Sequence, residues 1–419
     1  MAQTRTRAGR GTWLSQFPLP LRELALIRLV SSLGAGAVLY LTPLVFHQVG
    51  FSAVDVTQGV ALAALAGTAG RLLCGLLLDR GLNCSLPVLL AILASLAGDS
   101  QLLGAAGLDG YLLGQLLIGL AMGLYWPAIE LAVPLSCAAP PAPIPSARGY
   151  ALVRSADAAG IASGALIGSV LAGRTWLRGI YVLDILCLIA MALLLLLRPL
   201  PAPQRRAATE IDDSWRQWLP PLLPLLAITL LATTLPALMQ SALPLDLVRG
   251  GLARRAVPET LGALLIGLQL GLLVLIQWPV GQALARRPVG IGLGLSLVSF
   301  ALGTGLLAGS TLLAGGIWLV LLAQPPLALG QAAFLPIATE AVIELTARPH
   351  QGLAMALFSQ CFAISAFAAP LLAGLALEGH GHGGFLWLAM ALLCLAGLLL
   401  VRRLGPASPA CVSRSTRRR

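Results

Sequence analysis

Two oppositely charged residues lie three positions apart inside a long apolar stretch, Arg154 and Asp157. An ionisable side chain in such a stretch is costly and is a candidate for function. At helical spacing the two share one face and can form an internal ion pair. The carboxylate then either carries a coupling proton or only neutralises the arginine beside it. The residue types alone leave both interpretations open.

Two more arginines interrupt apolar stretches. Arg71 shares a helix face with Gly75 and Asp79, and Arg28 lies close to Glu23. Each arginine either anchors an anionic group, extends to the membrane interface or pairs with a carboxylate.

Four carboxylates near helix ends have simpler expected roles. Asp184 lies near Arg178, and we expect its role to be local. Three glutamates fall at predicted helix ends close to Arg148 and Arg348, and they are Glu130, Glu340 and Glu344. We expect these three to join a charge cluster that holds two halves of the molecule together.

The elements that position these residues are transmembrane helices. Of the 419 residues, 58% are hydrophobic and 10% are charged, whereas a cytosolic domain carries about 25% charged residues. A membrane span needs roughly 20 apolar residues. Division of the chain at charges and turns predicts an all-α integral membrane protein with twelve spans. They are residues 22–47, 57–78, 86–106, 109–131, 149–173, 177–197, 219–245, 260–284, 289–309, 313–343, 349–377 and 383–403.

A charged insert divides these spans into two groups of six. We predict an N-terminal tail at 1–21, a six-helix bundle at 22–197, a linker at 198–218, a second bundle at 219–403 and a basic tail at 404–419. All 27 cations are arginines, and placing both termini in the cytoplasm puts most of them there, as insertion favours. A bacterial inner membrane is the expected location. The basic tails would contact anionic lipid, and no nucleic-acid partner is expected.

The two groups of spans read as an internal repeat. Span 2 ends in a segment from Arg71 to Arg80 that aligns without gaps with the segment from Gln277 to Arg286 in span 8. Spans 4 and 10 both carry a proline followed by a glutamate. Duplicated six-helix halves place a substrate site at the interface between the halves.

With these features the chain resembles the major facilitator superfamily over almost its whole length. The family's loop motif between helices 2 and 3 is similar to Gly75-Leu-Leu-Leu-Asp79-Arg80-Gly81. The resemblance implies a conformational switch in which Gly75 permits close helix contact and Asp79 accepts N–H bonds at the start of helix 11. The chain departs from the motif at residues 83–85, where the family has arginine or lysine.

A second motif resembles that of the family's drug/proton antiporters. Gly160, Gly164 and Gly168 recur every four residues in span 5 and form one smooth face for helix packing. Ala165 replaces the proline of the antiporter motif. The resemblance favours export in exchange for protons.

The family resemblance also implies a cavity lined by helices 1, 4, 7 and 10. The candidate lining residues, with polar neighbours from other spans, are Tyr40, Tyr125, Trp126, Gln240, Gln269, Gln324, Gln331, Gln360, Arg28 and Arg71. Aromatic rings and amides with few charges suit a neutral or amphipathic solute. Some of the amides would instead only bridge helices.

The sequence therefore predicts a secondary transporter that exports small hydrophobic or amphipathic compounds in exchange for protons, and we expect it to be monomeric in its membrane. An importer of a sugar or organic acid is the alternative, followed by a membrane assembly factor that transports nothing. No nucleotide-binding G-x-x-x-x-G-K-[ST] or catalytic cluster is present, so we expect no enzyme activity and no cofactor. His380 and His382 in a glycine-rich loop do not predict a metal site.

Overall fold

The computed structural model describes residues 13–51, 53–140, 143–174, 176–203, 215–257, 259–347 and 350–404. The predicted tails and linker therefore lie largely outside the described residues, as do Arg348 and the side chain of Tyr40. Within the described ranges the chain forms twelve α-helices and one short 3-10 helix, Trp13–Gln16.

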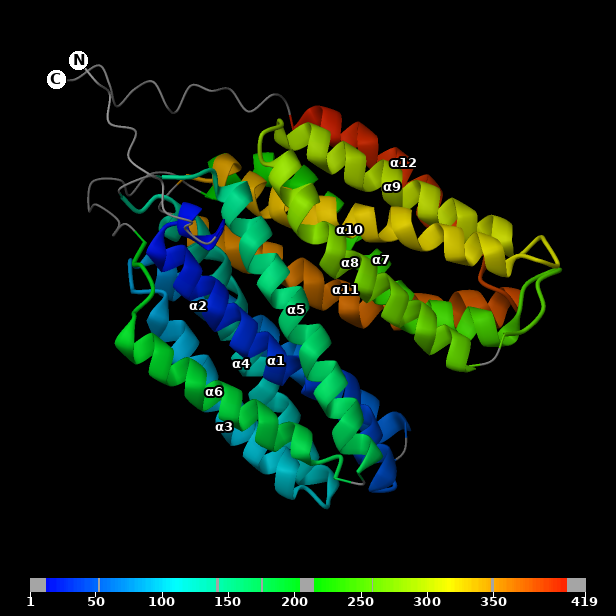
Figure 1. The fold of residues 1–419 in the computed structure, drawn as a ribbon, viewed down its shortest axis with the longest axis horizontal. Helices are drawn as coiled ribbons and strands as arrows, with labels where there is room; N and C mark the ends of the chain where they lie inside the picture. The colour runs from blue at the N-terminus through cyan, green and yellow to red at the C-terminus, as the bar shows by residue number, and fades with distance from the viewer. Residues whose placement is uncertain are drawn as a thin grey trace, which may run out of the picture.

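The twelve predicted spans are confirmed (Figure 1). The helices are α1 Leu19–Gln48, α2 Ala53–Asp79, α3 Ser85–Gly104, α4 Leu108–Cys137, α5 Ser146–Gly173, α6 Gly179–Leu197, α7 Trp215–Arg249, α8 Glu259–Leu284, α9 Val289–Ser310, α10 Ile317–Leu345, α11 Gln351–His380 and α12 Gly384–Arg403. The largest shift is at the end of α4, which continues six residues past the predicted end at residue 131. Gly81 and Gly381 end α2 and α11 in the left-handed region, which glycine adopts without steric cost.

The helices group into two similar halves, α1–α6 and α7–α12, which lie side by side as two lobes (Figure 1). In the first half α2 packs on α4 and α1 packs on α5. The corresponding helices of the second half repeat this arrangement, with α8 on α10 and α7 on α11. The internal repeat seen in the sequence is therefore a repeat of structure.

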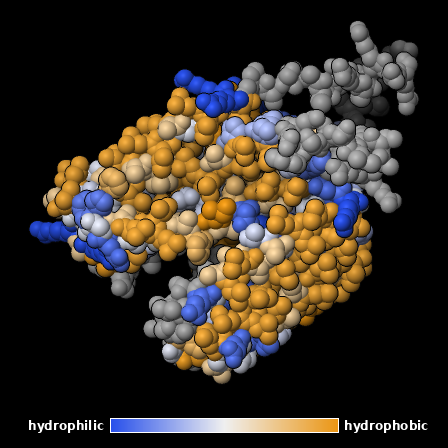
Figure 2. Space-filling view, turned by 180° about the vertical axis from the view of Figure 1, so that it is seen from behind, coloured by the Kyte–Doolittle hydropathy of each residue, from blue (hydrophilic) through white to orange (hydrophobic). Residues whose placement is uncertain are grey.

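The outer surface is apolar over most of the face shown in Figure 2. Leucines on the outer helices are widely exposed, among them Leu197 on α6 and Leu275 on α8. Among the described residues, nine helices are long and apolar enough to cross a membrane, and α1 and α5, which carry buried charges, are not among them. The chain is a multi-pass membrane protein whose apolar surface faces lipid.

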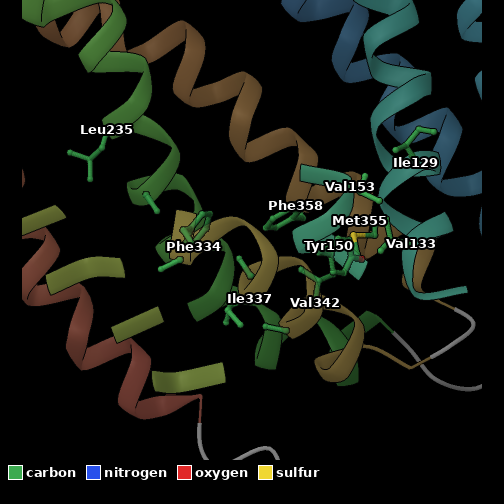
Figure 3. Close-up of a cluster of buried hydrophobic side chains, with 14 of the residues drawn as sticks. Ile129, Val133, Tyr150, Val153, Leu235, Phe334, Ile337, Val342, Met355 and Phe358 are labelled. Carbon is green, nitrogen blue, oxygen red and sulfur yellow. The ribbon is translucent and has the colours of Figure 1, made fainter. Parts of the chain in front are cut away.

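The two halves meet at one end of the bundle, which we call the closed end, where α1 begins and α12 ends. At the other end, the open end, the lobes diverge, and the surface between them is hollowed (Figure 2). Buried apolar side chains from α4, α5, α10 and α11 interlock towards the closed end (Figure 3). They include Val133, Tyr150, Val342, Met355 and Phe358. This apolar cluster packs the two halves together between the hollow and the closed end.

Candidate functional site

A cavity of about 170 Å³ lies within the first half, between α1, α3, α4, α5 and α6. Most of its wall is apolar and comes from Val38, Ile92, Met122, Leu188 and Met191, with alanines between them. Its polar wall carries charged, hydroxyl and aromatic side chains, namely Arg28, Ser31, Ser32, Ser95, Tyr125, Trp126, Asp157 and Asp184. Apolar walls with a few fixed polar groups are typical of sites for small organic molecules.

Four buried charges from α1, α4 and α5 form a cluster beside this cavity, and two of them, Arg28 and Asp157, line it. Arg28 contacts Asp157 at 2.9 Å, and Arg154 contacts Glu130 at 2.6 Å and Asp157 at 3.6 Å. All four residues are no more than 8% exposed. Two arginines and two carboxylates balance one another, so the cluster is neutral as a whole and satisfies the rule that buried charges are paired.

Aromatic side chains of α4 cover this cluster. The guanidinium of Arg28 lies 3.9 Å from the ring centroid of Trp126 and 5.3 Å from that of Tyr125. The Tyr125 hydroxyl is hydrogen-bonded to Ser31 Oγ at 2.6 Å. Cation–π contacts of this kind are worth about 2 kcal/mol when desolvated. The rings therefore fix the position of Arg28 at the cavity wall.

The contacts of Asp157 bear on the two roles that the sequence left open. Its carboxylate accepts a hydrogen bond from Ser32 and faces both Arg28 and Arg154. Donors and cations on this many sides stabilise the ionised form. The geometry therefore favours the role of counterion, with Arg28 as a partner that the sequence spacing did not identify.

The expected position of Glu130 is wrong. It was placed at a helix end beside Arg148, but α4 continues to Cys137, so Glu130 lies about two turns inside the helix and pairs with Arg154. Arg148 instead donates to the side-chain oxygens of Gln282 and Gln16. The apolar pattern of the sequence does not mark the end of α4, which is why the predicted position was wrong.

The other two glutamates do lie near the end of α10. Glu340 is half-buried and lies beside the backbone of Ala147 on α5. Glu344 is exposed one turn later. The contact from Glu340 joins α10 to α5 across the two halves at the closed end.

The cavity described here is not the one expected between helices 1, 4, 7 and 10, because its lining comes from α1, α3, α4, α5 and α6, all in the first half. The residues predicted to line a cavity therefore divide into groups. Arg28, Tyr125 and Trp126 line the cavity of the first half. Gln324 is fully buried and donates to Val320 within its own helix, so it does not reach the surface of the hollow. Gln360 donates to Thr68 Oγ1 and bridges α11 to α2, as expected for an amide that joins helices.

The remaining amides lie in the second half, apart from this cavity. Gln240 is exposed on α7, Gln331 is half-buried on α10, and Gln269 is buried on α8. Tyr40 belongs to α1, and its side chain is outside the described part of the chain.

The loop-motif residues join α2 to α11 at the closed end. A side chain at Gly75 would meet the backbone of Leu353 and Gly352, at 3.1 and 3.2 Å from its Cβ. Asp79 accepts the backbone N–H of Gly352 at 2.9 Å and that of Leu353. These contacts are the geometry that the motif implies, because they stabilise the first turn of α11.

The residues on either side of the contact made by Asp79 lie in different surroundings. Arg80 is exposed beyond the end of α2, and Gly81 terminates the helix. Arg71, two turns inside α2, is 6% exposed, and its Nε donates to Ser359 Oγ of α11 at 3.1 Å. Arg71 therefore connects the two halves and does not extend to the membrane interface.

The glycine face of α5 packs against α1 within the same half. A Cβ at Gly160 would overlap the Leu29 carbonyl oxygen, one at Gly164 that of Leu33, and one at Gly168 the Leu41 side chain. Small residues permit this close backbone approach. The close approach brings Arg28 and Asp157 within contact distance.

Two features of the structure were not predicted from the sequence. Asp99 of α3 is fully buried and lies at hydrogen-bonding distance from Asp184 of α6. At the open end of the second half, buried Asp246 bonds Arg254 at 2.9 Å and accepts the N–H groups of Gly383 and Trp387. A lone aspartate within the predicted span 86–106 was the signal available for the first feature.

Comparison with known proteins identifies the fold. The profile described as Major Facilitator Superfamily matches residues 24–302. No curated protein matches the sequence at a significant level.

Solved structures match over nearly the whole chain. The structure of a transporter of that superfamily, FucP, in the outward conformation has a TM-score of 0.75 at 14% identity, covering 92% of this chain and 98% of that one. The E. coli fucose:proton symporter FucP gives 0.72 at 13% identity, with the same coverage. A bacterial homologue of the iron transporter ferroportin, in its outward-facing state, gives 0.71 at 15% identity, covering 92% and 98%. At these identities the likeness concerns the fold alone.

Proposed function

This chain belongs to the Major Facilitator Superfamily of transporters, and we propose that it exports small hydrophobic or amphipathic organic compounds in exchange for protons. The observation that supports this proposal most is the cavity of about 170 Å³ beside the buried charge cluster. A molecule with an apolar body would contact the aliphatic and methionine walls. A polar group on the same molecule would reach Arg28, Tyr125 or the hydroxyls of α1.

The contacts between the halves support an alternating-access cycle. At the closed end, α2 contacts α11 and α5 contacts α8, whereas the lobes diverge at the open end. Rocking one half against the other would break the closed-end contacts and expose the cavity there. We infer from the arginine bias that the closed end faces the cytoplasm, which makes the described conformation outward-facing.

The character of the cavity wall disfavours the alternative of a sugar importer. A sugar needs a hydrogen-bonding partner for most of its hydroxyls, since unpaired polar groups in an apolar site are costly. Here the wall is mostly aliphatic, aromatic or methionine. The helix-5 glycines, which resemble those of antiporters, support the export direction.

Accumulation assays in a host that lacks its own efflux pumps test the proposal. Cells expressing the chain should accumulate less of at least one compound in a panel of lipophilic dyes and antibiotics, and a protonophore should remove the difference. Trp126→Ala should weaken export because Trp126 covers Arg28 at the cavity. Trp318→Ala is the matched control, because Trp318 is 74% exposed on the surface of α10.

No change for any compound, with the protein folded in the membrane, would contradict export of this class. Higher accumulation in expressing cells would reverse the proposed direction.

A further inference from the structure

We propose that Asp99 and Asp184 form a proton-binding pair that holds one shared proton and exchanges it with the cavity. This site is distinct from the charge cluster around Asp157. That its proton is the one that drives transport rests on the proposed function; that the pair binds a proton does not.

The pair lies inside the membrane span near the open end. Asp99 is five residues before the end of α3, and Asp184 is five residues after the start of α6. At 1.5 Å per residue both are about 7.5 Å from that end of their helices. Asp99 is 0% exposed and Asp184 is 7% exposed. The two carboxyl groups therefore face each other at the same depth, shielded from bulk water.

No cation neutralises the pair among the described residues. Neither carboxyl oxygen of Asp99 has a hydrogen-bond donor within the described part of the chain, and the charged group that acts on it is the carboxylate of Asp184. Arg178 lies about one and a half turns before Asp184, and its guanidinium donates hydrogen bonds to the carbonyl oxygens of Leu103 and Ala105 instead. Two bare carboxylates at hydrogen-bonding distance repel strongly, so one proton must lie between them.

The other titratable groups around the pair do not replace that proton. On α6 they are Tyr181 and Cys187, on α4 Tyr111 and Tyr125, and on α1 and α5 Arg28 and Asp157 across the cavity. The Tyr181 hydroxyl donates to Thr42, and Arg28 is paired with Asp157. The Tyr125 hydroxyl is bonded to Ser31, and neither Tyr111 nor Cys187 can supply a positive charge, so the pair depends on its own proton.

The cavity gives this proton a route to water. Asp184 lines the cavity, and a volume of about 170 Å³ holds several water molecules. When the shared proton leaves, the carboxyl group transfers it to a cavity water, which becomes hydronium, and two carboxylates remain. A ligand that fills the cavity would displace that water and separate the pair from the solvent.

Helix α1 holds Asp184 in place. A Cβ on Gly34 would overlap Asp184 Oδ1 and come within 2.9 Å of its Cα. Only a residue without a side chain lets α1 approach α6 so closely at this position. Because Arg28 lies on the same helix, a movement of α1 would change the charge cluster and the proton pair together.

Infrared difference spectroscopy of the purified chain in lipid nanodiscs tests the pair without any substrate. The wild type at pH 7 should show the carbonyl band of a buried protonated carboxyl group, which shifts in D2O. Asp99→Asn and Asp184→Asn should each remove this band, because an amide donates to the remaining carboxylate in place of the shared proton. Asp157→Asn and the exposed Asp109→Asn should both retain it.

A wild type without the band, or single variants of the pair that keep it, would overturn the proposal. The conservative variant Asp184→Glu is the control for misfolding. It should keep the carbonyl band of a protonated carboxyl group at a shifted position. Failure of the dye and antibiotic assays would reject the transport proposal and leave this spectroscopic result standing by itself.

Discussion

The substitution Asp157→Asn tests whether Asp157 is an ionised counterion. Asparagine has the shape of a protonated aspartic acid, so the change would be nearly silent if Asp157 carried a proton in this conformation. If Asp157 is ionised, the change leaves Arg28, 2% exposed, without its partner at 2.9 Å. Removal of one partner from a buried pair costs about 3–5 kcal/mol. We expect about 3 kcal/mol, because Glu130 still lies near Arg28.

A double-mutant cycle isolates the pair from other effects of the substitution. Arg28→Gln should cost a similar amount, because it leaves the carboxylate with the more distant Arg154. The double variant removes both charges and should cost about 1 kcal/mol, the value of a changed neutral hydrogen bond. The double variant should therefore be about 2 kcal/mol more stable than either single variant.

Equilibrium unfolding in mixed micelles of fixed composition measures these differences in free energy. Asp184→Asn is the contrasting control, since it replaces an acid that already shares a proton, and it should change the free energy of unfolding by about 1 kcal/mol at most. An Asp157→Asn variant as stable as the wild type would refute the counterion role. So would a double variant less stable than both single variants.

Three further substitutions test other contacts. Asp79→Ala removes the acceptor at the start of α11, should cost about 1 kcal/mol, and should raise labelling of an introduced cysteine at the closed end. Gly281→Leu pushes a side chain into Ala151 and should widen the distance between spin labels on α5 and α8; an unchanged distance would argue against tight closure there. Arg254→Met leaves Asp246 buried without its cation and should lower the free energy of unfolding by about 3–5 kcal/mol, measured beside the exposed Arg255→Met.

Local sequence patterns were sufficient to predict the helices and the contact between Arg154 and Asp157. Apolar length predicts a membrane span directly, and residues three apart on a helix meet whatever surrounds them. The bond from Asp79 to the start of α11 was also expected, because the family resemblance specifies which helices meet there. These predictions needed no knowledge of how the halves pack.

Contacts between distant segments could not be predicted in the same way. Arg28 and Asp157 are 129 positions apart, and their pairing depends on the approach of α1 to the glycine face of α5. Glu130 was misplaced because the apolar pattern of α4 does not show that the helix continues to Cys137. Asp99 gained its significance only when α6 placed Asp184 opposite it.

Reconstitution of the purified chain into proteoliposomes tests proton-driven export in the absence of every other transporter of a cell. We expect an imposed pH gradient to drive movement of at least one lipophilic dye or antibiotic against its concentration gradient. This movement should be lost with a protonophore and in Trp126→Ala, and retained in Trp318→Ala. A folded, reconstituted wild type that moves none of the compounds, or moves them equally without a pH gradient, would contradict the claim.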